Sequence, residues 1–213
     1  LLMSKILDFE IKNYKGIAST RIELSGKIDT PIIMLIGLNE SGKTTILEAI
    51  SQFVSSDKSV SSLYTFSPEN DKEFTFIPAS QKGSFKGVVS VAATVLLDEA
   101  EIMAIEKLAE TFGFEVDIEA LGKKFRIAKE INFANDPNGE SSGSLGLELN
   151  VKLPCDEEFE PFAYPDNPEV DVWERIAELV VEGVPTVAYF PTFLINVPEE
   201  IQLAPFQGES YEQ

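Results

Sequence analysis

The 213-residue sequence predicts an α/β fold with a mixed β-sheet and an additional antiparallel β lobe. Three observations support this class. An apolar run at residues 31–36 leads through a glycine-rich loop into a helical stripe, a pattern typical of a buried parallel strand followed by a helix. Alternating segments at residues 5–12 and 18–24 flank a short turn, which favours a β-hairpin. Between residues 86 and 190, strand-like and helix-like segments follow one another.

The first elements follow from local periodicity. Residues 5–12 alternate between apolar and polar side chains, residues 13–17 supply a turn, and residues 18–24 return as a second strand. Residues 45–54 predict a helix because their apolar side chains recur at helical spacing; these are Ile46, Leu47, Ile50, Phe53 and Val54.

The middle of the chain predicts a β-rich lobe at residues 86–153 that includes one helix. Residues 55–85 are rich in Ser and Lys without periodicity, and we expect a flexible loop region there. Within the lobe, we expect a strand at 86–97, a helix at 98–112 and a hairpin with a solvated turn at 134–143. The strands of that hairpin are residues 124–133 and 145–153, and residues 116–121 stay ambiguous.

The C-terminal third predicts an exposed connection, a helix and a strand. Residues 154–169 are rich in proline and acidic residues, and residues 170–181 have the pattern of an amphipathic helix. Residues 186–190 have the pattern of a buried strand, whereas no regular pattern follows residue 196.

The composition excludes several classes of function. The sequence has no histidine, which removes His-based catalytic triads and the commonest zinc ligand. No apolar run is long enough to span a membrane and no leader pattern is present, so we expect no membrane partner and a cytoplasmic location. The single cysteine, Cys155, fits a reducing compartment.

The formal net charge of −19 argues against direct nucleic-acid contact by this chain, because phosphate binding needs clustered Lys and Arg. Two interpretations of the charge stay open. In one, repulsion between like charges keeps the chain soluble. In the other, a basic partner or a basic segment outside this sequence makes the contact with a polynucleotide.

The glycine-rich loop at residues 37–44 matches G-x-x-x-x-G-K-[ST] at every fixed position, and it lies between a predicted strand and a predicted helix. Gly37 and Gly42 allow tight folding around an anion, and the following helix N-terminus favours negative charge. Lys43 is expected to contact the β- and γ-phosphates, and the Thr44 hydroxyl is expected to ligate Mg²⁺. The loop therefore predicts binding of a nucleotide with Mg²⁺.

The loop and the opening strand resemble the ABC-like ATPase heads of the SMC, RecF and OLD (overcoming lysogenization defect) groups. The run Asn39-Glu40-Ser41-Gly42-Lys43-Thr44 is most similar to the OLD branch, and Asn13-Tyr14-Lys15-Gly16-Ile17 resembles the start of such heads. The resemblance implies an ABC/SMC-like P-loop NTPase head whose N-terminal part spans residues 3–213. It also implies that ATP is bound by the loop and by Lys15; the loop residues are Gly37, Asn39, Glu40, Ser41, Gly42, Lys43, Thr44 and Thr45. A solvated turn lysine is the alternative for Lys15.

Heads of this kind hydrolyse ATP with a Leu-Ser-Gly-Gly-type motif and a later Asp-Glu pair, and neither is found in this sequence. Asp98 and Glu99 follow an apolar strand and could in principle hold Mg²⁺ and polarise water. The alternative, which we favour, is that Asp98 caps the following helix. The resemblance further implies a homodimer or higher oligomer formed through the heads, and a nuclease or other effector partner in DNA repair or anti-phage defence.

Two other functions stay open at this stage. One is a self-sufficient P-loop NTPase that uses Asp98 and Glu99. The other is a regulatory module that binds nucleotide only to control assembly with a partner.

Overall fold

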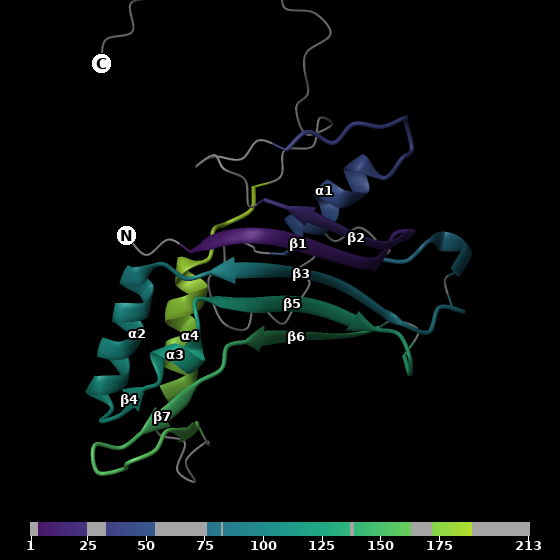
Figure 1. Cartoon of the computed structure of the whole chain (residues 1–213). Coiled ribbons are helices and arrows are strands. Elements are labelled where there is room, and N and C mark those ends of the chain that lie inside the picture. Colours follow the sequence, from purple (N-terminus) through teal and green to yellow (C-terminus); the bar gives the residue numbers. More distant parts are fainter. Residues whose placement is uncertain are drawn as a thin grey trace, which may run out of the picture.

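A computed structural model of the chain describes residues 4–24, 33–53, 76–81, 83–136, 139–162 and 172–188. The described strands form a five-stranded sheet in the order β2-β1-β3-β5-β6 and a three-stranded sheet in the order β4-β7-β8 (Figure 1). All described strand pairs are antiparallel. The elements are β1 (Lys5–Tyr14), β2 (Ile17–Glu23), α1 (Lys43–Ser51), η2 (Ala79–Gln81), β3 (Val88–Leu96), α2 (Glu99–Thr111), β4 (Glu115–Val116), α3 (Ile118–Leu121), β5 (Lys124–Asn132), β6 (Glu140–Gly146), β7 (Asn150–Lys152), β8 (Glu160–Pro161) and α4 (Val172–Gly183).

The predicted N-terminal hairpin is confirmed. β1 and β2 pair from Asp8 opposite Glu23 to Tyr14 opposite Ile17. The two residues between the strands, Lys15 and Gly16, both have positive φ angles, of 45° and 95°. This tight turn brings the Lys15 side chain to Glu48 of α1.

The central strand β3 organises the core. Val89, Val91 and Val95 on β3 are fully buried, as expected for a strand that has β1 on one side and β5 on the other. Phe9 of β1 packs edge-to-face on Phe53, just after α1, with ring centroids 5.3 Å apart. Figure 1 shows α1 beside the hairpin at one end of the sheet and α2, α3 and α4 gathered near the other end. The core thus holds the helix that follows the phosphate loop against the first strand.

The start of the chain is tied to both large helices at this second end. The Ser4 hydroxyl donates to the buried Glu101 carboxylate of α2 at 2.6 Å, and the Ser4 backbone N–H donates to the Gly183 carbonyl of α4. α2 and α4 also pack against each other. A Cβ on Gly183 would come within 1.8 Å of the Glu101 carboxylate, so only glycine fits this junction as it stands.

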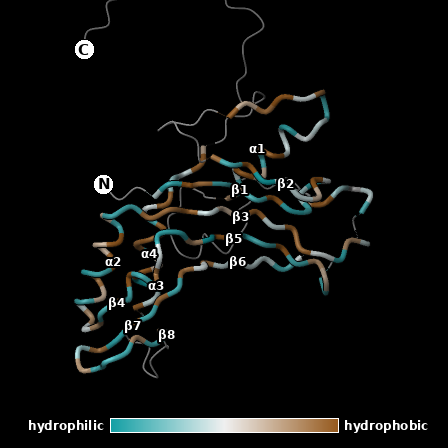
Figure 2. The backbone as a smooth tube through the Cα atoms, in the orientation of Figure 1, coloured by the Kyte–Doolittle hydropathy of each residue, from teal (hydrophilic) through white to brown (hydrophobic). Residues whose placement is uncertain are grey.

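The predicted buried strand before the phosphate loop is not observed in its described part. Residues 33–38 form no strand, and Ile33, Met34 and Ile36 are 42%, 76% and 86% exposed. Figure 2 shows this hydrophobic segment in brown, lying apart from the sheet at the top of the view. A wholly apolar strand needs neighbouring strands and covered faces. No described strand pairs with residues 33–38, so the apolar pattern alone was insufficient for the prediction.

The predicted hairpin of the β-rich lobe is correct in its first strand and wrong in its second. The partner of β5 is β6 at Glu140–Gly146, which begins inside the stretch predicted to be a turn and includes only the first two residues of the predicted second strand. β7 instead pairs with β4 and β8 in the smaller sheet. Ser and Gly have low strand propensity, but the β5 backbone supplies the pairing that makes this edge strand.

The remaining expectations are largely met. β3, α2 and α4 correspond to the segments predicted at 86–97, 98–112 and 170–181, and the ambiguous residues 116–121 contribute to β4 and α3. α1 begins at Lys43, two residues earlier than predicted. Residues 186–188 form no regular element, and most of the expected loop at 55–85, the end of the strand at 186–190 and the tail lie outside the described residues. In the described part of the chain, no helix has the length and hydrophobicity needed to cross a membrane.

Candidate functional site

The phosphate loop forms a tight turn at the N-terminus of α1. Glu40 and Gly42 have positive φ angles of 65° and 87°, and Gly42 is the residue that precedes the helix. A Cβ on Gly37 would lie 2.6 Å from the Ser41 Oγ, so the loop closes on itself where glycine leaves room. The two glycines of the motif are therefore explained by the backbone path.

The N-terminus of α1 is available to an anion. No side chain caps it, and its first turn carries no acidic residue. Uncapped N–H groups at the positive end of a helix attract negative charge. This contrasts with α2, whose N-terminus is closed by its own side chains.

The Lys43 ammonium is held over the loop by the loop itself. Lys43 Nζ donates to the carbonyl oxygens of Gly37 at 2.8 Å and Leu38 at 2.5 Å, and it lies 3.3 Å from the Ser41 Oγ. If a phosphate binds at the loop, the Lys43 ammonium can exchange its neutral carbonyl partners for an anionic oxygen. A hydrogen bond to an anionic oxygen is stronger.

These features line one pocket of about 430 Å³. Besides Lys43, the loop and the start of α1 contribute Asn39, Glu40, Ser41, Gly42, Thr44 and Thr45, and the β1–β2 hairpin contributes Lys15, Gly16 and Ile17. The structure therefore brings Lys15 together with the predicted phosphate-loop residues. Gly37 is not among the lining residues; it shapes the loop from behind through its contact with Ser41.

Glu48 is the partner of Lys15 beside the pocket, a contact that was not predicted from the sequence. Its Oε2 lies 2.7 Å from Lys15 Nζ, and both side chains are about one quarter exposed, 23% and 27%. Glu48 is on α1, the helix that begins with Lys43. It is the one acidic residue of a helix otherwise made of Lys, Thr, Ile, Leu, Ala and Ser, and that isolation is the signal that could have identified it.

Asp98 and Glu99 occupy a different setting. The Asp98 carboxylate accepts from the Glu101 N–H at 2.7 Å, and the Glu101 carboxylate accepts from the Asp98 N–H at 2.7 Å. This reciprocal pair is a capping box at the start of α2. The Glu99 side chain is 90% exposed, and neither residue lines the phosphate-loop pocket.

Replacing Asp98 with alanine is expected to lower the free energy of unfolding by about 1–2 kcal/mol, because the Glu101 backbone N–H at the start of α2 loses the carboxylate that caps it. Urea unfolding followed by circular dichroism measures this change. Asp117→Ala is a matched control, because Asp117 caps the one-turn helix α3 with a single bond of 3.0 Å and should cost less. A wild-type stability for Asp98→Ala would contradict the capping role.

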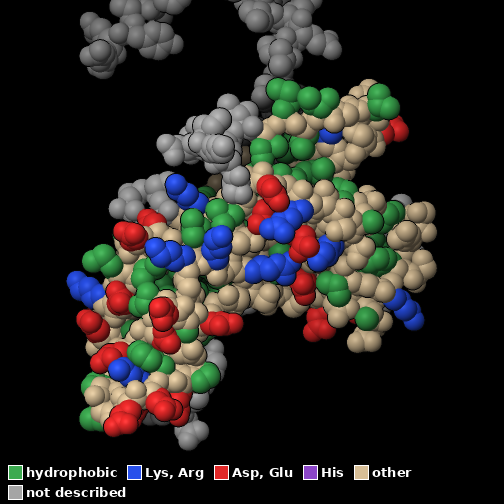
Figure 3. Space-filling model, in the orientation of Figure 1, with side chains coloured by type: hydrophobic (Ala, Val, Ile, Leu, Met, Phe, Trp, Pro, Cys, Tyr) green, Lys and Arg blue, Asp and Glu red, His purple; other side chains and the backbone are tan. Residues whose placement is uncertain are grey.

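Several charged side chains of the large sheet form ion pairs, within one strand or between strands. Glu10 lies within ion-pair distance of Lys12 and Arg126, and Asp8 pairs with Arg21 at 2.9 Å. Hydrogen bonding to Lys12, helped by the charge of Arg126, lowers the pKa of Glu10. Figure 3 shows these alternating blue and red side chains over the middle of the sheet. At these positions the cations are paired with carboxylates, unlike a surface built to bind a polynucleotide.

A family model described as AAA ATPase domain matches residues 4–168. No curated protein matches the sequence. A solved structure from a study of ATP-driven dimerization and DNA-stimulated activation of SMC ATPases aligns with 17% identity and a TM-score of 0.38, over 84% of this chain and 80% of that chain.

Proposed function

This chain belongs to the family of AAA ATPase domains, and we propose that its loop at residues 37–44 binds ATP with Mg²⁺. The observation that carries the proposal is the pocket in which the uncapped α1 N-terminus, Lys43 and Lys15 meet. Two ammonium groups and a row of backbone N–H groups at one small pocket match the charge of a polyphosphate.

The residues of the loop also fit a magnesium ion bound together with the nucleotide. Thr44 is exposed at the mouth of the pocket and offers a hydroxyl oxygen, a ligand that Mg²⁺ accepts together with phosphate oxygens and water. When bound, Mg²⁺ neutralises phosphate charge. The role of the chain is to place Thr44 beside Lys43 at the first turn of α1.

Titration calorimetry with ATP tests the proposal directly. We expect binding that weakens when EDTA removes Mg²⁺ and is much weaker for AMP, which lacks the β- and γ-phosphates that Lys43 is proposed to contact. If ATP and AMP bound equally, or if neither bound, the proposal would be wrong.

We further propose that the site is half of a composite site, as the resemblance to SMC- and OLD-type heads implies. The loop residues Asn39, Glu40, Ser41 and Thr44 are exposed, which leaves room for a second head to cover the nucleotide. A nuclease or other effector partner in DNA repair or anti-phage defence, and a cytoplasmic location, belong to the same proposal. Light scattering of the chain with and without ATP and Mg²⁺ measures head association; a monomer in both conditions would argue against it.

Hydrolysis by this chain alone is the second candidate function, with Asp98 and Glu99 as the acidic pair. The capping box of Asp98 and the exposure of Glu99 favour the first function over this one. Steady-state phosphate release separates the two. ATP turnover that Glu99→Gln abolishes without weakening ATP binding would assign catalysis to this pair.

Lys15 and Glu48 provide a prediction within the proposed site. We expect Glu48→Gln to weaken ATP binding about three- to tenfold, because the Lys15 ammonium loses the partner that holds it at the pocket. In a Lys15→Met background, the same Glu48→Gln change should not weaken binding. Calorimetry on the four proteins of this double-mutant cycle gives the coupling.

The cycle also separates positioning from simple repulsion. If Glu48 acted only as a negative charge near the phosphates, Glu48→Gln would strengthen ATP binding in both backgrounds. That result would show that Glu48 does not position Lys15, while leaving ATP binding itself established.

A further inference from the structure

A second cavity, larger than the phosphate-loop pocket, lies away from that loop at the end of the molecule formed by the β4-β7-β8 sheet. Its volume is about 890 Å³, and it shares no lining residue with the phosphate-loop pocket. Its walls come from the end of α2, from β7 and β8 with their connection, and from the start of α4. Neither the family match nor the proposed ATP site gives this cavity a role.

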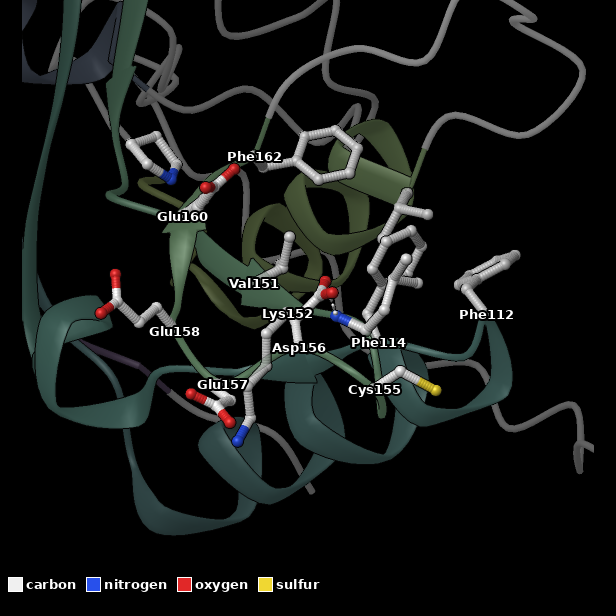
Figure 4. A pocket seen from close by; sticks show the side chains of 13 residues that line it. Phe112, Phe114, Val151, Lys152, Cys155, Asp156, Glu157, Glu158, Glu160 and Phe162 are labelled. Atoms are coloured by element: carbon white, nitrogen blue, oxygen red, sulfur yellow. Dashed lines mark hydrogen bonds between the residues drawn. The ribbon is translucent and has the colours of Figure 1, made fainter.

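The cavity has two chemically different sides, and we call it the acidic–aromatic cavity. Phe112, Phe114 and Phe162 form one side and are only partly buried. Glu157, Glu158 and Glu160 are exposed on the other side (Figure 4). In Figure 4 the rings lie toward the right and top, and the three carboxylates lie toward the left. Such a site can accept an apolar group and a positive charge together.

Within the described part of the chain, no Lys or Arg forms an ion pair with Glu157, Glu158 or Glu160. The lysine of the cavity, Lys152, pairs instead with Glu115 at 3.0 Å. This differs from the middle of the large sheet, where acidic side chains face Lys and Arg.

A lysine of the cavity wall already lies over an aromatic ring. Lys152 Nζ lies 4.8 Å from the centre of the Phe159 ring, within the range of a cation–π interaction. Phe159 is 39% exposed and Leu153, which lines the cavity, is 48% exposed. Apolar surface of this kind, bordered by charge, marks interaction sites on soluble proteins.

We propose that the acidic–aromatic cavity docks a basic segment of a partner polypeptide. An apolar side chain of that segment packs on the phenylalanines, and flanking Lys or Arg residues lie against Glu157, Glu158 and Glu160. Charge complementarity selects this occupant, because the cavity is acidic and the whole chain carries a net charge of −19, which attracts basic partners from a distance.

Cys155 makes the test specific to the cavity. It is the single cysteine of the chain, it is exposed, and it lines the cavity. A small environment-sensitive fluorophore on Cys155 therefore reports events at this place. Calorimetry on the unlabelled protein checks that the dye does not create or block binding.

The probe is a synthetic six-residue peptide in which a Leu-Phe pair is flanked on each side by two lysines. Two control peptides separate the contributions: one replaces the lysines with glutamates, and the other replaces Leu-Phe with Ser-Ser. We expect the basic apolar peptide to shift the dye emission and both controls to bind at least about tenfold more weakly, because each lacks one half of the recognition.

Charge reversal provides the matched protein variants. Glu157→Lys with Glu158→Lys should weaken the peptide about tenfold or more at low salt. Glu23→Lys with Glu140→Lys makes the same change in net charge at exposed positions on β2 and β6 and should have little effect. Equal weakening by both pairs would mean non-specific attraction and would overturn the proposal.

Two further outcomes would assign the cavity to another occupant and also overturn the proposal. Emission that indicates a shielded dye in the free protein, together with no response to peptide, would assign it to the chain's own residues 163–171. Emission that changes with protein concentration in the absence of peptide would assign it to a second copy of the chain.

Discussion

Replacing Lys43 with alanine is expected to reduce ATP affinity at least about a hundredfold. The ammonium lies within bonding distance of two carbonyl oxygens and a hydroxyl of the phosphate loop, at the place where an anion is proposed to bind. Charge-assisted hydrogen bonds contribute about 1.5–3 kcal/mol each, so the loss of one bond corresponds to about a ten- to hundredfold change and the loss of two to more than about a hundredfold. Calorimetry with Mg²⁺ and ATP measures the change.

The fold should survive this substitution. Lys43 bonds only to its own loop in the described structure, and the core contacts are made farther along the chain, by Ala49 of α1 and by Phe53 just after it. Thermal unfolding should therefore match the wild type. Lys107→Ala, at an exposed position on α2, is the matched control and should leave both affinity and melting temperature unchanged. ATP affinity retained within about threefold in Lys43→Ala would refute the central proposal.

The wild-type protein is expected to gain stability as the pH rises above 7, because of the buried Lys129, and replacing Lys129 with methionine is expected to remove this gain. Lys129 lies on β5 opposite Val91 of β3 and Gly143 of β6, and its side chain is 1% exposed. Burial in these surroundings lowers the pKa of Lys129 to about 8. An unfolded lysine has a pKa of about 10.5. Between these two values the unfolded chain holds a proton that the folded chain has released.

The sign of the effect follows from proton linkage. Where the unfolded state binds more protons, the free energy of unfolding rises with pH. Below about pH 8, Lys129 is charged in both states and the folded protein carries the full desolvation cost. Between pH 7 and pH 9.5 the wild type should gain about 2 kcal/mol of stability from this residue, a gain that Lys129→Met cannot show.

Urea unfolding of both proteins across this pH range gives the free energy of unfolding of each as a function of pH. In the difference between the two curves, the contributions of the other titrating groups cancel. We expect Lys129→Met to be the more stable relative to wild type at pH 7, with the advantage shrinking as the pH rises. Lys124→Met, at an exposed position of the same strand, should run parallel to the wild type throughout. If the curve of Lys129→Met also ran parallel to that of the wild type, the lowered pKa of Lys129 would be contradicted.

The sequence predicted best what depends on neighbouring residues. The phosphate loop is contiguous, so its glycines, Lys43 and Thr44 could be assigned roles from spacing alone. The β1–β2 hairpin and the Asp98 cap also depend on residues that are close to one another in the sequence, and both are observed.

Features that depend on distant partners were predicted poorly. The run 31–36 has the composition of a buried strand, but burial requires neighbours that sequence periodicity does not supply. β6 is a strand because β5 pairs with it, despite a Ser- and Gly-rich sequence. Glu48 belongs to the site because the β1–β2 turn, 33 residues away, brings Lys15 to it.

The exposed run at residues 33–38 has a consequence for how this chain behaves in solution. Ile33, Met34, Leu35 and Ile36 are consecutive, apolar and uncharged, and β-branched residues favour cross-strand association between copies. The net charge of −19 opposes such association through repulsion, which acts over about a Debye length and shortens as salt is added. Dilute buffer should therefore keep the chain dispersed, whereas high salt should promote its aggregation through this segment.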